Sequence, residues 1–498
     1  MRSAGPDGLR KTLSHSVIYG VGLGAQNIVG LIMLPIYTRF LTPADYGTLG
    51  MMQIIIDLVS MIFGAQLSHG VFRNFYAAQT VGEKNSVVAS ALGFVIAFKL
   101  VGVGVLAVLA GPSARLLFGS EDLSGYMALF GVSLLTSSLF IIPFQYLRAL
   151  ERPAAFVALS LLKLIIQVCL NVYFLVQLGM GVLGVIWATV LTGLTLGLSM
   201  AAWTLVRTRF SFSLAQARNL MSFSWPLILT GLMSLYISAG ARSLISTFSG
   251  LADVGLFMLA NRLSAVMSSG IVRPFQQAWI PRRFKLVGSD DGMRTYGRGF
   301  LLVSVVLVIA GVALATFAPE VLRLMSDRAF WSAAAIVPIL VLQNVITAAS
   351  RFSRFGLLVE GRTKAFLSPM VVSALGATAI GFLLVEPFGA VGIAWALVCQ
   401  AALNLWLIER KERSAFDVKL PWGRFWILVT TGSLVYVLST LVEPGTLVAF
   451  IYKTCLLAVF VVIVVFSPIV GRQERKALLR LGTDLANSVR RRTRDSRA

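Results

Sequence analysis

The chain has 498 residues, of which 57% are apolar and 13% are charged, and its formal net charge is +22. So few charged residues cannot cover a soluble protein of this length, which excludes a soluble class and indicates a protein of the lipid bilayer. The cations lie mainly in alternate loops, a pattern typical of orientation in a membrane, so the positive charge does not indicate a nucleic-acid partner.

Apolar segments of about 20 residues can cross about 30 Å of hydrocarbon, and the sequence contains about fourteen of them. In chain order we expect the first six near 14–38, 46–70, 87–110, 124–147, 155–177 and 182–206. The next six are expected near 223–248, 254–279, 299–318, 331–356, 366–386 and 389–409, with a final pair near 425–442 and 446–468. The sequence therefore predicts an all-α integral membrane protein.

The Lys and Arg residues of alternate loops predict that both termini are cytoplasmic, since cytoplasmic loops carry the excess of cations. The first span lacks a signal-peptide cleavage site and is expected to remain as a helix. The longest outer loop, near 111–123, leaves no room for an extracellular domain. We predict the following segments: a cytoplasmic N-terminus 1–13, an N-lobe 14–206, an amphipathic cytoplasmic linker 207–222, a C-lobe 223–409, a helix pair 410–470 and a basic tail 471–498.

An internal duplication relates the two predicted lobes. The stretch Gly181–Val190 returns as Gly389–Val398, a shift of about 208 residues. Ala44-Asp-Tyr-Gly47 and Ala252-Asp-Val-Gly255 pair in the same register. Six spans per half is an even number, so the repeats should have parallel orientation with a substrate site between them. We interpret the glycines of the longer motif as sites of close helix packing.

Patterns typical of enzymes and metal sites are weak. The stretch Gly20–Ala25 fits a loose dinucleotide pattern, but it lies inside a predicted span, so no nucleotide cofactor is expected. The two histidines, His15 and His69, have no cysteine or carboxylate at ligand spacing, so no metal site is predicted. No paired carboxylates accompany the spans, which argues against catalysis. We expect the three cysteines to be apolar packing residues: Cys169, Cys399 and Cys455.

Ionisable residues inside the predicted spans are the informative ones. A charge at mid-bilayer costs about 2.5 to 3.5 kcal/mol, so such a residue should face water, a ligand or an opposite charge. Arg242, Arg273 and Arg351 lie near span ends, where their side chains can instead reach the membrane surface. Lys453 is expected to be an interfacial anchor. The deeper ionisable residues are Asp57, Lys99, Lys163 and Arg262.

The repeat indicates that these charges are not needed by the fold. The shift aligns Leu34 with Arg242 and Ile54 with Arg262, so the other half does without them. We predict a cation-dominated cavity between the lobes, suited to an anionic, hydroxyl-rich cargo, because arginine binds phosphate through two parallel hydrogen bonds. Polar residues expected to line it are Gln26, Asn27, Gln53, Gln167, Asn171, Asn261, Gln343 and Asn344.

Two motifs carry a resemblance to a known family. They are Leu34-Pro-Ile-Tyr-Thr-Arg-Phe-Leu-Thr-Pro-Ala-Asp-Tyr-Gly47 and Gly181-Val-Leu-Gly-Val-Ile-Trp-Ala188. With its fourteen-span pattern, the chain resembles polysaccharide-unit flippases, such as those for O-antigen and exopolysaccharide, of the multidrug/oligosaccharidyl-lipid/polysaccharide exporter superfamily. The resemblance implies alternating access, in which two lobes carry an undecaprenyl-pyrophosphate-linked oligosaccharide from the inner to the outer leaflet of the bacterial cytoplasmic membrane. Membrane lipids and other polysaccharide-assembly proteins are the further partners it suggests.

Span position and charge select the residues expected to hold this cargo. Arg242 and Arg262 come first, and Asp57 is expected to be an internal counter-ion or proton carrier. The other predicted substrate-binding cations are Lys99, Lys163, Arg273 and Arg39, and the predicted polar cavity residues are Gln26, Asn27, Gln53 and Asn261. Of all these, only Arg39 lies within a family motif.

Three alternative functions stay open. A lipid II flippase carries a pyrophosphate on the same lipid, so its cargo is not excluded. A cation-coupled multidrug antiporter shares the fold but needs buried carboxylates, and only Asp57 is clearly deep. A membrane polysaccharide polymerase or ligase is the least favoured, because it needs a large outer loop with catalytic groups.

Overall fold

The computed structural model consists of helices in all of its described regular elements, which confirms the all-α prediction. It describes residues 33–63, 71, 74–150, 152–272, 290–354, 363–415, 420–442, 446–467 and 471. The chain divides into two compact units: residues 1–258 with 378–393, and residues 259–377 with 394–498. The division into lobes at 206 and 223 stays a prediction. Gly20–Ala25, His15, His69 and the basic tail beyond 471 lie outside the described residues.

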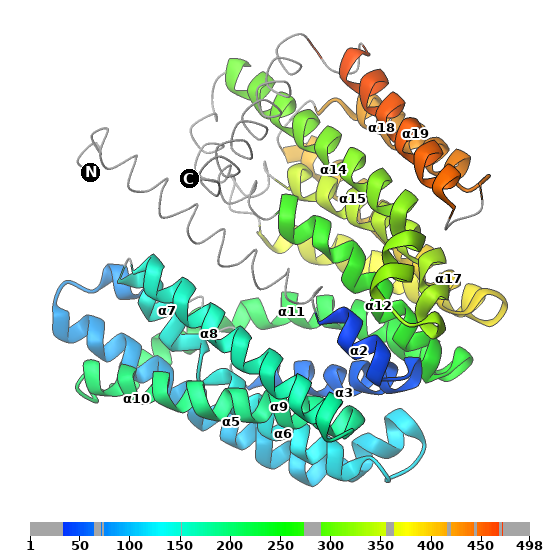
Figure 1. Cartoon of the computed structure of the whole chain (residues 1–498). Helices are drawn as coiled ribbons and strands as arrows, with labels where there is room; N and C mark the ends of the chain where they lie inside the picture. The colour runs from blue at the N-terminus through cyan, green and yellow to red at the C-terminus, as the bar shows by residue number, and fades with distance from the viewer. Residues whose placement is uncertain are drawn as a thin grey trace, which may run out of the picture. The chain divides into compact units, whose positions relative to one another are not determined.

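Helices α2 to α11 belong to the first unit, where α5 packs on α6, α10 and α11, and α6 packs on α9 (Figure 1). Their bounds are α2 Leu34–Phe40, α3 Pro43–Ile62, α5 Val81–Phe118, α6 Ser124–Ser138, α7 Ile141–Ala149, α8 Pro153–Val172, η1 Tyr173–Gln177, α9 Gly181–Thr192, η2 Gly193–Gly197, α10 Leu198–Arg207 and α11 Leu214–Ser249. Helix α12, Leu251–Met267, begins in this unit and ends in the second.

In the second unit, α14 packs on α15, α18 and α19 (Figure 1). The bounds are η3 Ser268–Val272, α14 Asp290–Met325, η5 Arg328–Ala335, α15 Val337–Ser353, η6 Thr363–Phe366, α17 Leu367–Ala415, α18 Trp422–Ser439 and α19 Leu447–Phe466. Phe300 forms the centre of its aromatic core, with ring centroids 5.4 Å from Phe352 and 5.6 Å from Phe425.

The outer helices are apolar on their exposed faces, as expected in a bilayer. Helix α19 has a mean hydropathy of 2.6 over its best window, yet Val448 is 73% and Ile463 is 58% exposed. Among the described residues, eight helices are long and apolar enough to span a membrane, or nine if the bent pair η5 and α15 is one span. The count of fourteen stays a prediction.

Some helix ends differ from the predicted span ends. The third span does not end at 110, because α5 continues through Pro112 to Phe118, and this leaves only a short turn where the loop 111–123 was expected. Helix α11 begins at Leu214, so part of the predicted linker 207–222 and the following span share one helix. The fourth predicted span, 124–147, agrees with the apolar span Ser124–Ala149, within which Leu139 and Phe140 separate α6 from α7. Hydropathy alone did not indicate where these helices continue or are interrupted.

The cysteines were also placed wrongly by the sequence. Each is a free thiol, and each lies on an exposed helix surface where packing in the core was expected: Cys169, Cys399 and Cys455. For a membrane-spanning helix, such a surface can face lipid. A thiol is weakly polar and tolerates either environment, so residue type did not distinguish them.

The repeated glycine motif adopts the same backbone conformation in both halves. Gly181 has φ 54° and Gly389 has φ 53°, in the left-handed region that favours glycine. Gly389 is the non-helical residue that interrupts α17, at the boundary predicted between spans 366–386 and 389–409. The first glycine of each motif therefore forms a turn. A Cβ on Gly181 would have no atom within reach, so the prediction that this glycine allows close helix packing was wrong. The second glycines do pack: a Cβ on Gly184 or Gly392 would meet the preceding helix.

The other repeated motif joins the two halves of the duplication within the first unit. A Cβ on Gly47 would overlap the carbonyl of Leu251, and a Cβ on Gly255 would overlap the carbonyl of Pro43. The contact is reciprocal, so equivalent turns of α3 and α12 approach each other backbone to backbone. Gly50, about one turn further along α3, contacts the side chain of Met258, which occupies the space that a Cβ would need. We call these contacts of Gly47, Gly50, Gly255 and Met258 the glycine seam.

We expect Gly47→Ala to destabilise the protein by about 1 to 3 kcal/mol or more, because the added methyl group overpacks the glycine seam against backbone that cannot rotate away. Gly255→Ala should have a similar effect. The measurement is thermal stability of the detergent-purified protein, scored by the monodisperse fraction that survives heating. Gly104→Ala is the control, since Gly104 lies inside α5 with open space around it. Equal stability of Gly47→Ala and Gly104→Ala would contradict the prediction.

Candidate functional site

A capping box defines the start of helix α3, and polar side chains lie along one of its faces. The Thr42 side chain accepts the Asp45 N–H at 3.1 Å, and the Asp45 carboxylate accepts the Thr42 N–H at 2.9 Å, forming a capping box. Gln53, Asp57 and Ser60 follow at helical spacing and share one side of α3. The Gln53 amide donates to Oδ1 of Asp57 at 2.8 Å. We call Gln53, Asp57 and Ser60 the α3 polar face.

Arg242 of α11 binds α3 beside this face. Its Nη1 donates to the carbonyl of Gly50 at 2.7 Å, and its Nε donates to the carbonyl of Ser238 at 3.1 Å. The side chain is 8% exposed and is attracted to the charge of Asp57. The alternative that Arg242 reaches the membrane surface was therefore wrong. Its remaining N–H groups donate to no described residue, so the guanidinium retains donors that can meet an oxygen of a ligand.

Lys99 of α5 joins the other end of the α3 polar face. Its Nζ donates to Ser60, at 2.9 Å to the carbonyl and 2.7 Å to the hydroxyl. Only 1% of its surface is exposed, and it forms no ion pair with any described carboxylate. Hydrogen bonds from an ammonium group offset part of its desolvation, so these two bonds tie α5 to α3. A substrate-binding role for Lys99 stays a prediction.

The remaining cations of the first unit lie apart from this cluster. Lys163 of α8 is half-buried, and its ammonium lies 4.2 Å from the centroid of the Phe140 ring, a cation–π contact in place of a carboxylate. Arg39 is exposed in the last turn of α2. The structure therefore brings together Arg242, Asp57 and Gln53, and Lys99 of α5 binds Ser60, about one turn beyond Asp57 on α3.

Other predicted site residues belong to the second unit or to undescribed segments. Arg262 is half-buried and engaged in further interactions, whereas its neighbour Asn261 is exposed. Arg273, Gln26 and Asn27 lie outside the described residues.

The polar residues expected in the cavity bind mainly along their own helices. Asn171 is fully buried, and its amide donates to the carbonyl of Gln167 at 2.8 Å. The Gln343 amide donates to Thr347 at 3.1 Å, and the Asn344 amide donates to the carbonyl of Leu340 at 2.9 Å. Such bonds lower the cost of placing amides in membrane helices and do not by themselves define a ligand site.

A buried ion pair in the second unit was missed by the sequence analysis. Nζ of Lys453 lies 2.6 Å from Oε1 of Glu320, and their side chains are 3% and 19% exposed. The interfacial anchor expected at Lys453 was therefore wrong. The available signal was a lysine within the very apolar helix α19, which needs a carboxylate partner, and Glu320 lies just beyond the predicted span end at 318.

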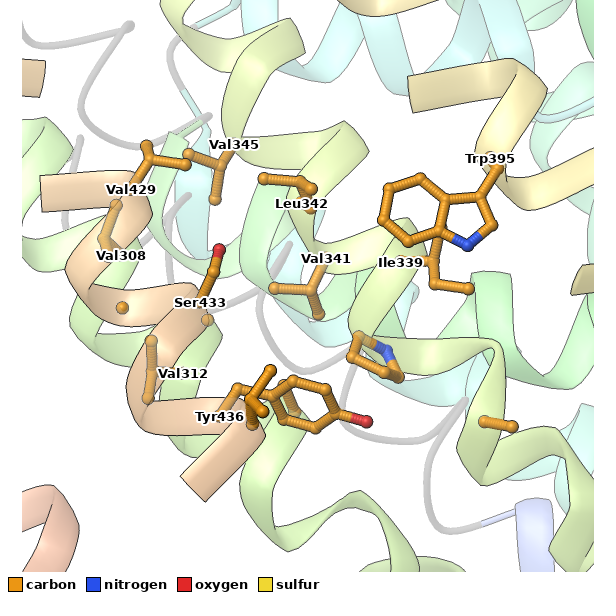
Figure 2. Close-up of a pocket in the computed structure, with 16 residues that line it drawn as sticks. Val308, Val312, Ile339, Val341, Leu342, Val345, Trp395, Val429, Ser433 and Tyr436 are labelled. Carbon is orange, nitrogen blue, oxygen red and sulfur yellow. The ribbon is translucent and has the colours of Figure 1, made fainter. Parts of the chain in front are cut away.

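The second unit also contains an apolar pocket of about 340 Å³. Figure 2 shows its valine and isoleucine side chains, with Trp395 of α17 on one side and Tyr436 of α18 on another. Its lining suits hydrocarbon, and it offers no cation for a phosphate. Among the described residues, no three His, Cys, Asp or Glu side chains lie close enough to hold a metal ion.

A known protein family matches more than half of the chain. The family described as polysaccharide biosynthesis protein matches residues 36–335, which include α3, α11 and the glycine seam. The chain belongs to this family. The resemblance inferred from the two motifs is thus confirmed. A search of curated protein sequences finds no match.

Solved structures show the fold of this family member. A structure of the lipid II flippase MurJ in an inward closed conformation matches with a TM-score of 0.67 at 11% identity, covering 90% of this chain and 98% of that one. An inward-facing multidrug resistance MATE family transporter of the MOP superfamily matches with a TM-score of 0.59 at 17% identity, covering 84% and 96%. A MOP superfamily transporter from Pyrococcus furiosus matches with a TM-score of 0.55 at 15% identity, covering 84% and 96%. The chain therefore shares the fold of these transporters.

Proposed function

We propose that this protein flips an undecaprenyl-pyrophosphate-linked oligosaccharide from the inner to the outer leaflet of the bacterial cytoplasmic membrane. Membership of a polysaccharide biosynthesis family and a transporter fold support a membrane step in glycan assembly. Transport by alternating access, with both termini in the cytoplasm, is part of this proposal.

The observation that carries the proposal is the partly bonded guanidinium of Arg242. It is held at the glycine seam by the Gly50 carbonyl, and it retains donors without a described partner. A guanidinium can give a phosphate two parallel hydrogen bonds, and this is worth more in a low-dielectric site than in water. Arg242 would hold the pyrophosphate, while the oligosaccharide head group follows it and the lipid tail stays in the bilayer.

Asp57 has the matching role of counter-ion. When no cargo is bound, its charge stabilises Arg242, and arrival of a pyrophosphate would displace that interaction without leaving a buried cation alone. Protonation of Asp57 would then couple transport to a proton gradient. Arg262, Lys163, Lys99, Arg273 and Arg39 remain proposed further contacts of the anionic cargo.

A lipid II cargo is the second candidate, favoured by the likeness to MurJ over 90% of the chain. Both cargoes present a pyrophosphate on a polyprenyl chain, so Arg242 serves either. The cation-coupled antiporter is less well supported, because Glu320, an enclosed carboxylate of the second unit, is already paired with Lys453.

The test is transport in proteoliposomes containing the purified full-length protein. Undecaprenyl-pyrophosphate oligosaccharide, lipid II and a cationic drug are supplied in parallel, and appearance in the opposite leaflet or lumen is measured against empty liposomes. We expect flipping of the oligosaccharide lipid at least about tenfold faster than in empty liposomes, a barrier difference of about 1.4 kcal/mol. Flipping of lipid II alone would replace the cargo with the second candidate. Uptake of the drug alone would overturn the flippase proposal.

A further inference from the structure

A second polar hollow lies at one end of the first unit, away from Arg242 and the α3 polar face. It has a volume of about 940 Å³ and is bounded by the start of α5, the ends of α7 and α10, and the turn that follows α10. Lys84, Arg207 and Arg209 line it, together with Asn85 and Tyr146. We call this hollow the basic pocket.

The three cations of the basic pocket have no carboxylate partner among the described residues. No acidic side chain lines the pocket, and in the part of the chain that the structure describes none of the three forms an ion pair. The nearby Glu83 carboxylate is occupied, since it caps α5 and accepts the Gln79 N–H at 2.8 Å. The pocket therefore combines three positive charges with no acidic side chain in its lining.

Aromatic rings orient two of these cations without neutralising them. The Lys84 ammonium lies 5.7 Å from the centroid of the Phe75 ring, and the Arg207 guanidinium lies 5.8 Å from that of Trp203. Cation–π contacts restrict a long side chain but leave its hydrogen-bond donors available to another group. The contacts therefore keep the Lys84 and Arg207 side chains beside the pocket.

The turn that contributes Arg209 has a strained backbone. Arg209 and Phe210 have φ of 54° and 52°, and they are the non-glycine residues with positive φ among those described. The turn is held in place because the Ser213 N–H donates to Oγ of Ser90 at 2.7 Å, which ties it to α5. Non-glycine residues in this region persist where the surrounding structure enforces them, often at ligand-binding positions. Here the enforced conformation places Arg209 on the pocket wall.

The rim of the basic pocket is apolar and exposed. Tyr76 and Val81 line the pocket and are 61% and 74% exposed, and Phe210, next to Arg209 in the chain, is 66% exposed. At the end of membrane-spanning helices, aromatic and aliphatic side chains beside cations are typical of the headgroup layer of a bilayer. An occupant that pairs an anionic group with an apolar body fits this combination.

We propose that the basic pocket binds a phosphate group, brought by an anionic lipid headgroup or by soluble phosphate. The apolar rim favours the lipid. This site is separate from Arg242, and the inference does not rest on the proposed cargo. Occupation would join α5, α7 and α10 at one membrane surface, so a bound lipid would stabilise this end of the first unit.

The test uses native mass spectrometry of the full-length protein in detergent, titrated with phosphatidylglycerol, with phosphatidylcholine as the uncharged-headgroup control. We expect preferential binding of phosphatidylglycerol. Lys84→Gln and Arg209→Asn should each weaken it about fivefold, and the double variant about 25-fold, which corresponds to about 1 kcal/mol per cation. Asparagine is chosen at 209 because it tolerates positive φ.

Arg218→Gln is the matched control, since Arg218 is an exposed cation of α11 that does not line the pocket. It should bind phosphatidylglycerol as the wild type does, and Arg209→Lys, which keeps the charge, should lose much less than Arg209→Asn. Competition with inorganic phosphate distinguishes the sources. Displacement of the lipid supports a phosphate site open to soluble anions, and failure to displace it supports a headgroup site. An equal loss in Arg218→Gln, or no loss in the pocket variants, would overturn the proposal.

Discussion

Replacing Arg242 with alanine is expected to reduce flipping of a lipid-pyrophosphate oligosaccharide at least about tenfold at equal reconstitution. Hydrogen bonds to a charged group contribute about 1.5 to 3 kcal/mol each, and the variant removes all of those that the guanidinium would give the pyrophosphate. Because Arg242 is also bonded to the Gly50 carbonyl and attracted to Asp57, the same variant should lose some stability. The measurement is initial flipping rate per folded protein in proteoliposomes.

Two further variants separate transport from stability. Arg242→Ala combined with Asp57→Asn removes both charges, so it should recover stability but not flipping. Arg242→Lys keeps the charge without the planar fork and should retain an intermediate rate. The control Arg218→Ala removes an exposed cation of the same helix and should transport as the wild type does. Recovery of flipping in the double variant would assign Arg242 a purely structural role.

Replacing Lys453 with methionine is expected to destabilise the protein by about 3 to 5 kcal/mol, because it leaves the Glu320 charge without its partner inside the second unit. The other carboxylate oxygen of Glu320 is already enclosed without a hydrogen-bond partner among the described residues. Methionine matches lysine in length, so the loss would come from charge rather than from a cavity. Thermal stability of the purified protein in detergent is the measurement.

The double variant Lys453→Met with Glu320→Gln should recover most of the lost stability, since neither residue then carries a charge. Arg115→Ala is the contrasting control. Its pair with Glu121 is close at 2.8 Å, but the side chains are 70% and 49% exposed, so its loss should cost about 0 to 1 kcal/mol. A Lys453→Met protein as stable as Arg115→Ala would show that the buried pair contributes little.

The internal repeat correctly identified equivalent positions in the two halves of the chain. The shift between the two halves predicted that Gly181 and Gly389 are equivalent, and they adopt nearly the same φ, although the turns they form were not predicted. The shorter repeated motif could not be interpreted beforehand. Only the fold shows that Gly47 and Gly255 meet each other, since a sequence repeat states equivalence and says nothing about contact.

The sequence by itself determined that this is an all-α membrane protein of duplicated design, because apolar length and repetition are properties of the chain alone. Only the tertiary structure decided how its buried cations are satisfied. Lys99 bonds Ser60 across 39 residues, Lys453 pairs with Glu320 across 133, and Arg242 bonds the Gly50 carbonyl across 192. A buried cation can donate hydrogen bonds to the oxygen of a carbonyl, a hydroxyl or a carboxylate. Because many residues supply such an oxygen, the sequence pattern does not identify the partner. The packing of helices distant in the chain selects it.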